Sequence, residues 1–272
     1  MKTHRVTGGG NVQLHVVETG NERGRPILFL HGVSQCFLTW NLQMNSSLAD
    51  SHRLVAIDLR GHGLSDKPHD AYTDSKLWAD DINAVIQSLK LDHPVLSGWS
   101  YGPLVSLDYV RHYGEEGIGG LQFIGAVTKL GSPEALSVLT PEFLEIVPHF
   151  FSTDAETTAR GLERLLHLCF VRKPSPSEFY MMLGYNLSVP AYVRQGMFSR
   201  SFDNDDLLPK ITKPVLITHG AADAIVKPAA VEQHKAAMRH AQIQLVPNVG
   251  HGVFWDDPAG FNERLHAFCE SL

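Results

Sequence analysis

The chain has 272 residues, which is enough for one large α/β domain or for one domain with a sizeable insertion. Apolar residues make up 43% and charged residues 19% of the sequence, and this globular balance excludes the disordered, collagen-like and coiled-coil classes. The formal net charge of −6 argues against nucleic acid or an anionic membrane as the main partner.

Short apolar runs along the chain predict the strands of a mostly parallel sheet. The first, 11–19, alternates apolar and polar residues as a half-buried strand does. The later runs are continuously apolar, which is typical of strands buried on both faces of a parallel sheet. They occupy residues 26–30, 54–58, 94–97, 123–127, 214–218 and 243–246.

Helical patterns lie between these runs. Over residues 75–89, Trp78, Ile82 and Leu89 are among the apolar residues that fall on one face of a helix. Further helices are predicted over residues 101–113, 228–241 and 258–271. Because strands alternate with helices, the sequence predicts right-handed βαβ units with helices on both faces of the sheet.

One segment, residues 129–208, interrupts this alternation. It contains helical patches but no strand-like run, and it holds ten of the chain's 24 aromatic residues. We expect it to form a helical cap, or lid, on an α/β core built from residues 1–128 and 209–272. The apolar underside of such a cap would line a substrate pocket.

The most informative segment is residues 94–104, with the sequence PVLSGWSYGPL. A predicted buried strand ends there in the pattern G-x-S-x-G, from Gly98 to Gly102, and a predicted helix follows. The two glycines remove side chains that would collide in a tight turn, so that Ser100 can stand clear of the sheet. The N-terminus of the helix then favours negative charge beside Ser100. This pattern predicts that Ser100 is a nucleophile.

Together with three further segments, this motif makes the sequence resemble the α/β-hydrolase superfamily over nearly its whole length. The segments are FLHGVSQ at 29–35, DLRGHGLSDKP at 58–68 and VGHGVFWDDP at 249–258. The resemblance implies an α/β-hydrolase fold, with a mostly parallel sheet of about eight strands, flanking helices and an inserted helical cap. Pro103 departs from the second glycine that many relatives carry after the motif, although a first helical turn tolerates proline.

The order of the catalytic residues in this fold is nucleophile, acid, histidine, and the resemblance assigns the partners of Ser100 on that order. His251, in the loop after the last predicted strand, is the expected general base. Asp223, just past the preceding strand, is the expected acid that orients His251. Asp256 and Asp257 are rivals for the acid, but they follow the base in the sequence and are expected to cap the last helix.

Two backbone N–H groups are expected to form an oxyanion hole. One belongs to Tyr101, the residue after the nucleophile, and the resemblance implies that the other belongs to Val33. The side chains expected to line the substrate pocket are those of His31, Trp99, Phe143, Phe151, Tyr185 and Phe254. His31 is also expected to shape the loop that contains it.

Several other polar residues are interpreted as structural. The glycines of RGHG indicate a tight loop in which Asp58, Arg60 and His62 satisfy backbone groups. His15, His219 and the remaining histidines are interpreted as surface or packing residues. Because the histidines are scattered and form no HExxH or CxxC-containing pattern, we expect no bound metal and no cofactor.

Cysteine usage and the N-terminal sequence indicate where the protein works. The cysteines are widely spaced and odd in number, which argues against a disulfide framework. The N-terminal sequence MKTHRVTGGGNVQLHVV lacks the apolar core of a secretory signal, and no run approaches the roughly 18 apolar residues of a membrane-spanning helix. We therefore expect a cytoplasmic protein without a membrane or nucleic-acid partner, and the formation of a homo-oligomer is left open.

These residues together predict a serine-dependent hydrolase of carboxylic esters or lactones that acts through an acyl-enzyme. The aromatic and methionine content of residues 129–208 favours an apolar acyl or aryl group in a small-molecule substrate. The resemblance is to small bacterial esterases, including cofactor-free haloperoxidases and acyl-homoserine lactonases. A serine nucleophile disfavours the dehalogenase and epoxide hydrolase activities of the superfamily. C–C bond hydrolysis of a diketone and a small-molecule receptor with a retained triad remain alternatives.

Overall fold

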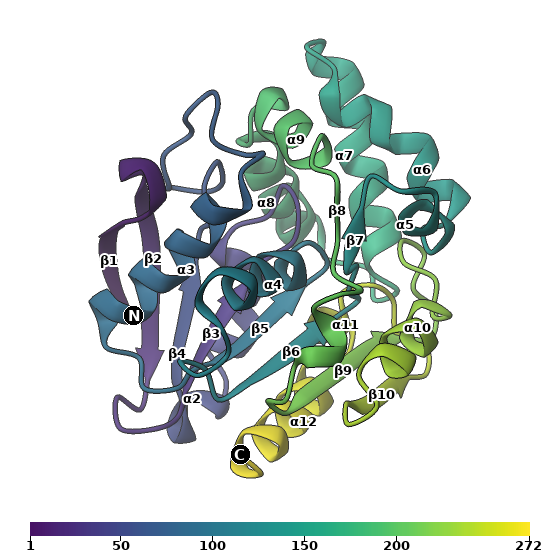
Figure 1. The fold of residues 1–272 in the computed structure, drawn as a ribbon. Coiled ribbons are helices and arrows are strands. Elements are labelled where there is room, and N and C mark those ends of the chain that lie inside the picture. The colour runs from purple at the N-terminus through teal and green to yellow at the C-terminus, as the bar shows by residue number, and fades with distance from the viewer.

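The computed structural model describes residues 1–272 and contains one large sheet with helices on both faces (Figure 1). The strands of this sheet are β1 (Lys2–Thr7), β2 (Gln13–Gly20), β3 (Pro26–Leu30), β4 (Arg53–Ile57), β5 (Val95–Trp99), β6 (Gly120–Ile124), β9 (Val215–Gly220) and β10 (Gln242–Val246). Their order across the sheet is β1-β2-β4-β3-β5-β6-β9-β10. β2 pairs antiparallel with β1 and β4, and every other pairing is parallel, so the predicted mostly parallel sheet is confirmed.

Two strands differ from the predictions. β1 was not predicted, because Val6 is its only buried residue and the strand lies at the edge of the sheet without an apolar run. β6 ends at Ile124, three residues before the predicted end. The apolar run continues past this point, but Gly125 adopts a left-handed conformation (φ 49°) that no strand accommodates.

Helices cover both faces of the sheet, as the alternation of elements predicts. The longer ones in the core are α3 (Ser75–Leu89), α4 (Gly102–Tyr113), α10 (Ala230–Ala237) and α12 (Pro258–Glu270), and the short ones are α1 (Asn41–Met44), α2 (Leu48–Ser51) and α11 (Val253–Asp256). Single 3-10 turns occur at η1 (Gly9–Asn11), η2 (Phe37–Trp40) and η4 (Leu208–Lys210). α10 is shorter at both ends than the predicted 228–241 helix. None of the helices combines the length and the hydropathy that crossing a bilayer requires.

The side chains of β3 show how the sheet separates two apolar layers. Leu28 and Leu30 pack in a cluster that includes residues of α3 and α4. Ile27 and Phe29 point the other way, into a cluster that includes residues of α1, α2 and α12. A strand whose successive side chains enter different apolar layers must be apolar at every position, which explains the continuous runs in the sequence.

The segment between β6 and β9 folds into helices that lie beyond the carboxyl ends of the parallel strands (Figure 1). It contains β7 (Lys129–Leu130), α5 (Pro133–Ser137), α6 (Pro141–Ile146), η3 (Val147–Phe151), α7 (Ala155–Cys169), α8 (Pro176–Leu187), α9 (Ala191–Phe198) and β8 (Phe202–Asp203). The expectation that this segment has no strand was wrong in one respect, since β7 and β8 pair antiparallel. This pair is too short to leave a pattern in the sequence, and it forms a stem where the segment leaves and rejoins the core.

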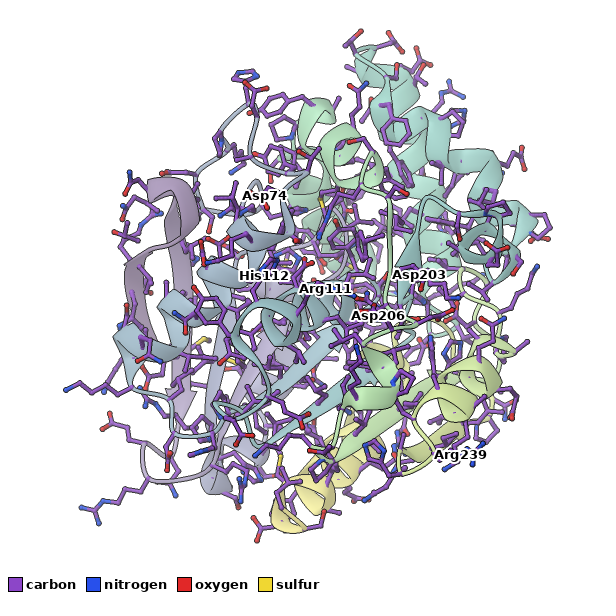
Figure 2. All side chains as sticks on the ribbon, viewed as in Figure 1. Asp74, Arg111, His112, Asp203, Asp206 and Arg239 are labelled. Carbon is purple, nitrogen blue, oxygen red and sulfur yellow. The ribbon has the colours of Figure 1, made fainter.

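The return limb of this segment is tied to α4 by polar contacts. Arg111 donates to both carboxylate oxygens of Asp206, at 2.8 and 3.2 Å, and to the backbone carbonyl of Asp203. Figure 2 shows Arg111 on α4 facing the segment that carries the two aspartates. Arg111 is half-exposed, so this contact positions the limb more than it stabilises the fold.

The loop after β4 is organised around buried polar groups, as predicted. The carboxylate of Asp58 accepts hydrogen bonds from the backbone N–H groups of Phe37 (2.7 Å) and Leu64 (2.9 Å) and contacts the imidazole of His15 at 2.8 Å. Asp58 is fully buried, which explains why it needs several partners. His15 is therefore a buried hydrogen-bonding partner rather than a surface residue.

The same loop contains a buried ion pair. The guanidinium of Arg60 donates to both carboxylate oxygens of Asp81 on α3, at 2.7 and 2.8 Å. It also donates to the backbone carbonyls of Gly9, Ala71 and Leu77. Both side chains are fully buried, so this pair joins η1, the loop and α3 inside the protein.

Candidate active site

Ser100 occupies the sharp turn between β5 and α4. Its φ of 58° lies in the left-handed region, which is strained for a residue other than glycine. The turn leaves no room for side chains at the flanking positions. A Cβ on Gly98 would lie 2.6 Å from the backbone nitrogen of Pro103, and one on Gly102 would lie 2.3 Å from the carbonyl oxygen of Leu30. The glycines of the motif are therefore required for the turn that exposes Ser100.

Asp223 holds His251 in a defined orientation. The Nδ1 of His251 lies 2.8 Å from one carboxylate oxygen of Asp223. The other carboxylate oxygen accepts hydrogen bonds from the backbone N–H groups of Ile225 (2.8 Å) and Val226 (2.9 Å). Both side chains are buried, and these three hydrogen bonds hold the carboxylate of Asp223 in place away from water. This arrangement leaves the Nε2 of His251 free to act as a base.

Two adjoining cavities meet at Ser100. The first is apolar, with 11 hydrophobic residues among the 14 that line it, and these include Leu139 and Phe143. The second is smaller, and both Ser100 and His251 line it. The structure has no hydrogen bond between Ser100 and His251, which is common before substrate binds. The shared cavity nevertheless places Ser100 and His251 around one space.

The backbone groups predicted for the oxyanion hole are available. Val33 lines both cavities and Tyr101 lines the apolar one. The backbone N–H groups of Val33 and Tyr101 donate to no acceptor within the structure. Because these two N–H groups have no other acceptor, both can donate to an oxyanion that develops beside Ser100.

A sequence model of the alpha/beta hydrolase fold family matches residues 25–258. The chain belongs to the α/β-hydrolase family. Among its relatives, the AB hydrolase superfamily protein YisY of Bacillus subtilis (strain 168) is 29% identical over 276 residues, covering 98% of this chain and 99% of that protein. The bifunctional esterase/perhydrolase DCH of Acinetobacter calcoaceticus is 27% identical, covering 98% and 99%. The crystal structure of the esterase RhEst1 from Rhodococcus sp. ECU1013 matches with a TM-score of 0.94 at 32% identity, covering 100% of both chains.

The predicted family and fold are thus confirmed, and the chain is an enzyme of the α/β-hydrolase type. Of the six side chains predicted to line the pocket of this α/β hydrolase, Trp99 and Phe143 contact the cavities beside Ser100. The other four lie outside both cavities, because hydrogen bonds or packing against other side chains hold them elsewhere. These are His31, Phe151, Tyr185 and Phe254.

His31 is withdrawn from the cavities by its own hydrogen bonds. Its Nδ1 donates to the carbonyl of Gly32 (2.7 Å), and its Nε2 accepts from the N–H of Leu59 (3.1 Å). His62 is held in the same way, between the carbonyl of Arg60 and the N–H of Ser34. Both histidines shape loops of the α/β hydrolase, as predicted for each.

The three aromatic residues outside the cavities belong to packing clusters. Phe254 packs edge-on against Trp99 and at a tilt against Trp40, with ring centroids 4.9 and 4.5 Å away. Phe151 packs edge-on against Phe198, at 5.5 Å. Tyr185 is buried in the apolar layer that also contains Trp40. Aromatic composition alone identified apolar residues but not the direction in which each side chain points.

The rival acids have different roles in the structure. Asp257 caps α12, since its carboxylate accepts from the N–H of Gly260 at 3.2 Å, as predicted. Asp256 does not cap this helix, and that prediction was wrong. Its carboxylate instead accepts from the N–H groups of Gly250 (2.8 Å), Val171 (2.9 Å) and Arg172 (2.9 Å). Asp256 therefore ties the loop of His251 to the segment after α7.

His219 was interpreted as a surface or packing residue, and the structure excludes the surface alternative. The side chain is fully buried, and its Nε2 lies 3.2 Å from the carboxylate of Asp223 and 3.0 Å from the carbonyl of Val226. Burial lowers the pKa of His219, so the ring is neutral at pH 7 and donates one hydrogen. The spacing of four residues between His219 and Asp223 across the end of β9 was the only sign of this contact in the sequence.

Replacing His219 with phenylalanine is expected to lower kcat/KM about tenfold, which corresponds to about 1.4 kcal/mol. KM should change little, because His219 lines neither cavity. Loss of the polar imidazole that lies 3.2 Å from the carboxylate of Asp223 leaves this charge stabilised more by the imidazolium of His251, so the acid limb of the kcat/KM profile should move to higher pH. The measurement is the pH dependence of ester hydrolysis.

The matched control is His234→Phe, since His234 is a second buried histidine close to His219. It makes no contact with Asp223, and its replacement should leave the pH profile unchanged. If both variants have the wild-type profile and differ only in stability, His219 has a packing role alone.

Proposed function

We propose that this α/β hydrolase is a serine hydrolase that cleaves carboxylic esters or lactones with an apolar acyl or aryl group. The observation that carries the proposal is the cavity shared by Ser100 and His251, with His251 bonded to Asp223 at 2.8 Å. The relatives support ester hydrolysis as the general activity, since one is named an esterase/perhydrolase and the matched crystal structure is that of an esterase.

In the proposed mechanism, the Oγ of Ser100 attacks the substrate carbonyl while the Nε2 of His251 takes its proton. The N–H groups of Val33 and Tyr101 stabilise the oxyanion of the tetrahedral intermediate. The intermediate collapses to an acyl-enzyme as His251 donates the proton to the leaving alcohol oxygen. Water, deprotonated by His251, then attacks the acyl-enzyme and releases the acid. Asp223 orients His251 and stabilises its protonated form throughout.

The apolar cavity supports the choice of an uncharged acyl or aryl group. Its only charged lining residue is Lys129, whose Nζ is paired with Asp205 at 2.5 Å. A carboxylate or ammonium on the substrate would lose its hydration there without gaining a partner. Much of the lining comes from residues 129–208, and we propose that this segment acts as the cap predicted from the sequence.

The test is the hydrolysis of p-nitrophenyl esters from acetate to octanoate, with an acyl-homoserine lactone beside them. Turnover of the esters, with kcat/KM rising as the acyl chain fills the apolar cavity, is expected. A fluorophosphonate probe should label Ser100, as read by mass spectrometry of the labelled peptide. Labelling without turnover of any ester or lactone would exclude the proposed substrate class and favour C–C bond hydrolysis. The absence of labelling would contradict a serine mechanism and favour a receptor.

A further inference from the structure

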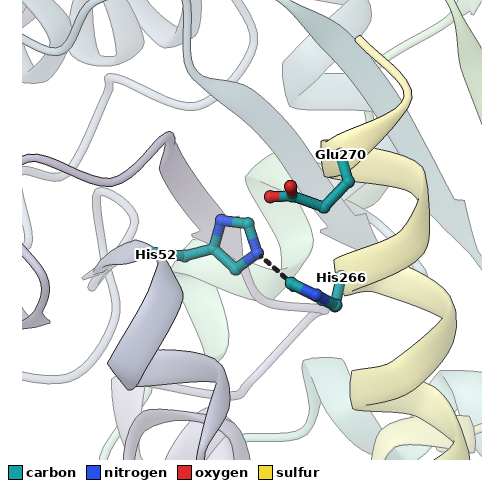
Figure 3. Close-up of side chains that lie close together, drawn as sticks. All are labelled: His52, His266 and Glu270. Atoms are coloured by element: carbon teal, nitrogen blue, oxygen red, sulfur yellow. Dashed lines mark hydrogen bonds between the residues drawn. The ribbon is translucent and has the colours of Figure 1, made fainter.

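Two histidines and a glutamate meet at the end of the sheet that lies opposite Ser100. His52 lies between α2 and β4, and His266 and Glu270 lie one turn apart on α12 (Figure 3). One donor atom from each side chain lies within 4.8 Å of the others. His52 precedes the amino end of β4, whereas Ser100 follows the carboxyl end of the parallel strand β5, so the cluster is separate from the active site.

The fold buries His52 and places the exposed residues His266 and Glu270 beside it. His52 is 1% exposed, its N–H donates to the carbonyl of Leu48 (3.0 Å), and its carbonyl accepts from the N–H of Asn21 (3.0 Å). His266 and Glu270 are four residues apart on α12, so their side chains lie on the same face of the helix. The donor atoms therefore converge without a rearrangement of the backbone.

The cluster contains atoms that could bind a metal ion and that make few hydrogen bonds within the protein. The Nε2 of His52 and the Nδ1 of His266 share one proton across 2.9 Å. The carboxylate of Glu270 makes no hydrogen bond or ion pair within the structure, although it lies beside both rings in Figure 3. The Nδ1 of His52 is buried and has no hydrogen-bond partner. A neutral imidazole is the form that binds a metal ion.

We propose that His52, His266 and Glu270 form a binding site for one Zn²⁺ ion, with water in the fourth position. Two imidazole nitrogens and one carboxylate oxygen are ligands that Zn²⁺ prefers, and three protein ligands with an open position form a known type of site. The ion replaces the proton that the two rings share. Tetrahedral Zn–N bonds of about 2.05 Å require the two nitrogens to be about 3.3 Å apart, so the rings must separate by a few tenths of an ångström.

The ion would join α12 to the segment that precedes β4, and its binding should stabilise the folded protein. The sequence did not indicate this site, because His52 and His266 are 214 residues apart and belong to no metal-binding pattern. The prediction of no bound metal rested on sequence spacing alone, which detects only ligands that are close along the chain.

The test is a titration of the full, chelator-treated protein with ZnCl₂ by isothermal calorimetry. We expect one equivalent to bind with a micromolar or lower Kd and to raise the thermal unfolding midpoint. Glu270→Gln and His266→Gln should each weaken binding at least tenfold. Glu163→Gln, which removes an exposed glutamate from α7, should bind within twofold of wild type.

Ester hydrolysis should remain at the wild-type rate in all three variants, because the cluster lies at the opposite end of the sheet. Co²⁺ absorption in the visible region should report a four-coordinate site in wild type and lose intensity in the Glu270 and His266 variants. Failure of the wild-type protein to bind Zn²⁺ would overturn the proposal. If wild type and both cluster variants bind Zn²⁺ with equal affinity, the ion binds at other histidines. His52 and His266 would then form a hydrogen-bonded pair and no metal site.

Discussion

Replacement of Ser100 by alanine is expected to lower kcat by about 10⁵- to 10⁶-fold, the range seen when the nucleophile of a serine triad is removed. Alanine lacks the Oγ that forms the acyl-enzyme in the proposed mechanism, while His251 and Asp223 keep their hydrogen bond because Ser100 bonds to neither of them. The fold should be retained, since alanine adopts the left-handed conformation at this position at a cost similar to that for serine. Single-turnover hydrolysis of a p-nitrophenyl ester measures the loss, and circular dichroism checks the fold.

The control is Ser106→Ala, which removes the hydroxyl of a buried serine on α4. Its hydroxyl bonds only to the carbonyl of Gly102 at 3.3 Å, one turn earlier in the same helix. This variant should keep kcat within a few-fold of wild type. An Ser100→Ala enzyme with more than one hundredth of the wild-type kcat, after purification from a host without a background esterase, would mean that another group is the nucleophile.

Replacement of Asp81 by asparagine is expected to lower the free energy of unfolding by about 3–5 kcal/mol. The change leaves the guanidinium of Arg60 charged and fully buried, with only backbone carbonyls and a neutral amide around it. A folded domain has a total stability of about 5–15 kcal/mol, so this loss is a large share of it. Denaturant unfolding, followed by far-UV circular dichroism, gives the difference.

Asp80→Asn is the matched control on the same helix. Asp80 is the adjacent residue, it is half-exposed, and it forms a surface ion pair with Lys76. Loss of an exposed pair should cost less than about 1 kcal/mol. Equal losses in the two variants would show that the buried pair contributes no more than a surface pair.

The strands that were predicted correctly are those whose burial produces a recognisable apolar run in the local sequence. β3 and β5 are buried at every position, so a continuous apolar run was sufficient evidence for each. β1 has only Val6 buried and relies on pairing with β2, which the local sequence does not encode. The turn around Ser100 was predictable for a related reason, since steric exclusion at Gly98 and Gly102 permits few other residues.

Contacts between distant segments could not be predicted from the sequence. Phe143 lines the cavities, whereas Phe151, eight residues later, packs behind Phe198, which itself lines the apolar cavity. Both residues satisfy the same compositional description, and only the packing of the helices between β6 and β9 distinguishes them. His219 shows the same limit, because its role depends on where β9 ends relative to Asp223.

The carboxylate of Asp256 connects the loop that contains His251 to the segment after α7. One of its oxygens accepts from both Gly250 and Val171, so a single group joins the neighbour of His251 to the segment after α7. The N–H of Gly252, on the other side of His251, donates to the carbonyl of Cys169 at 2.9 Å. The loop of His251 is thus held on both sides by the end of α7 and the residues that follow it. A displacement of these residues is therefore expected to shift the ring of His251 relative to Asp223 and Ser100.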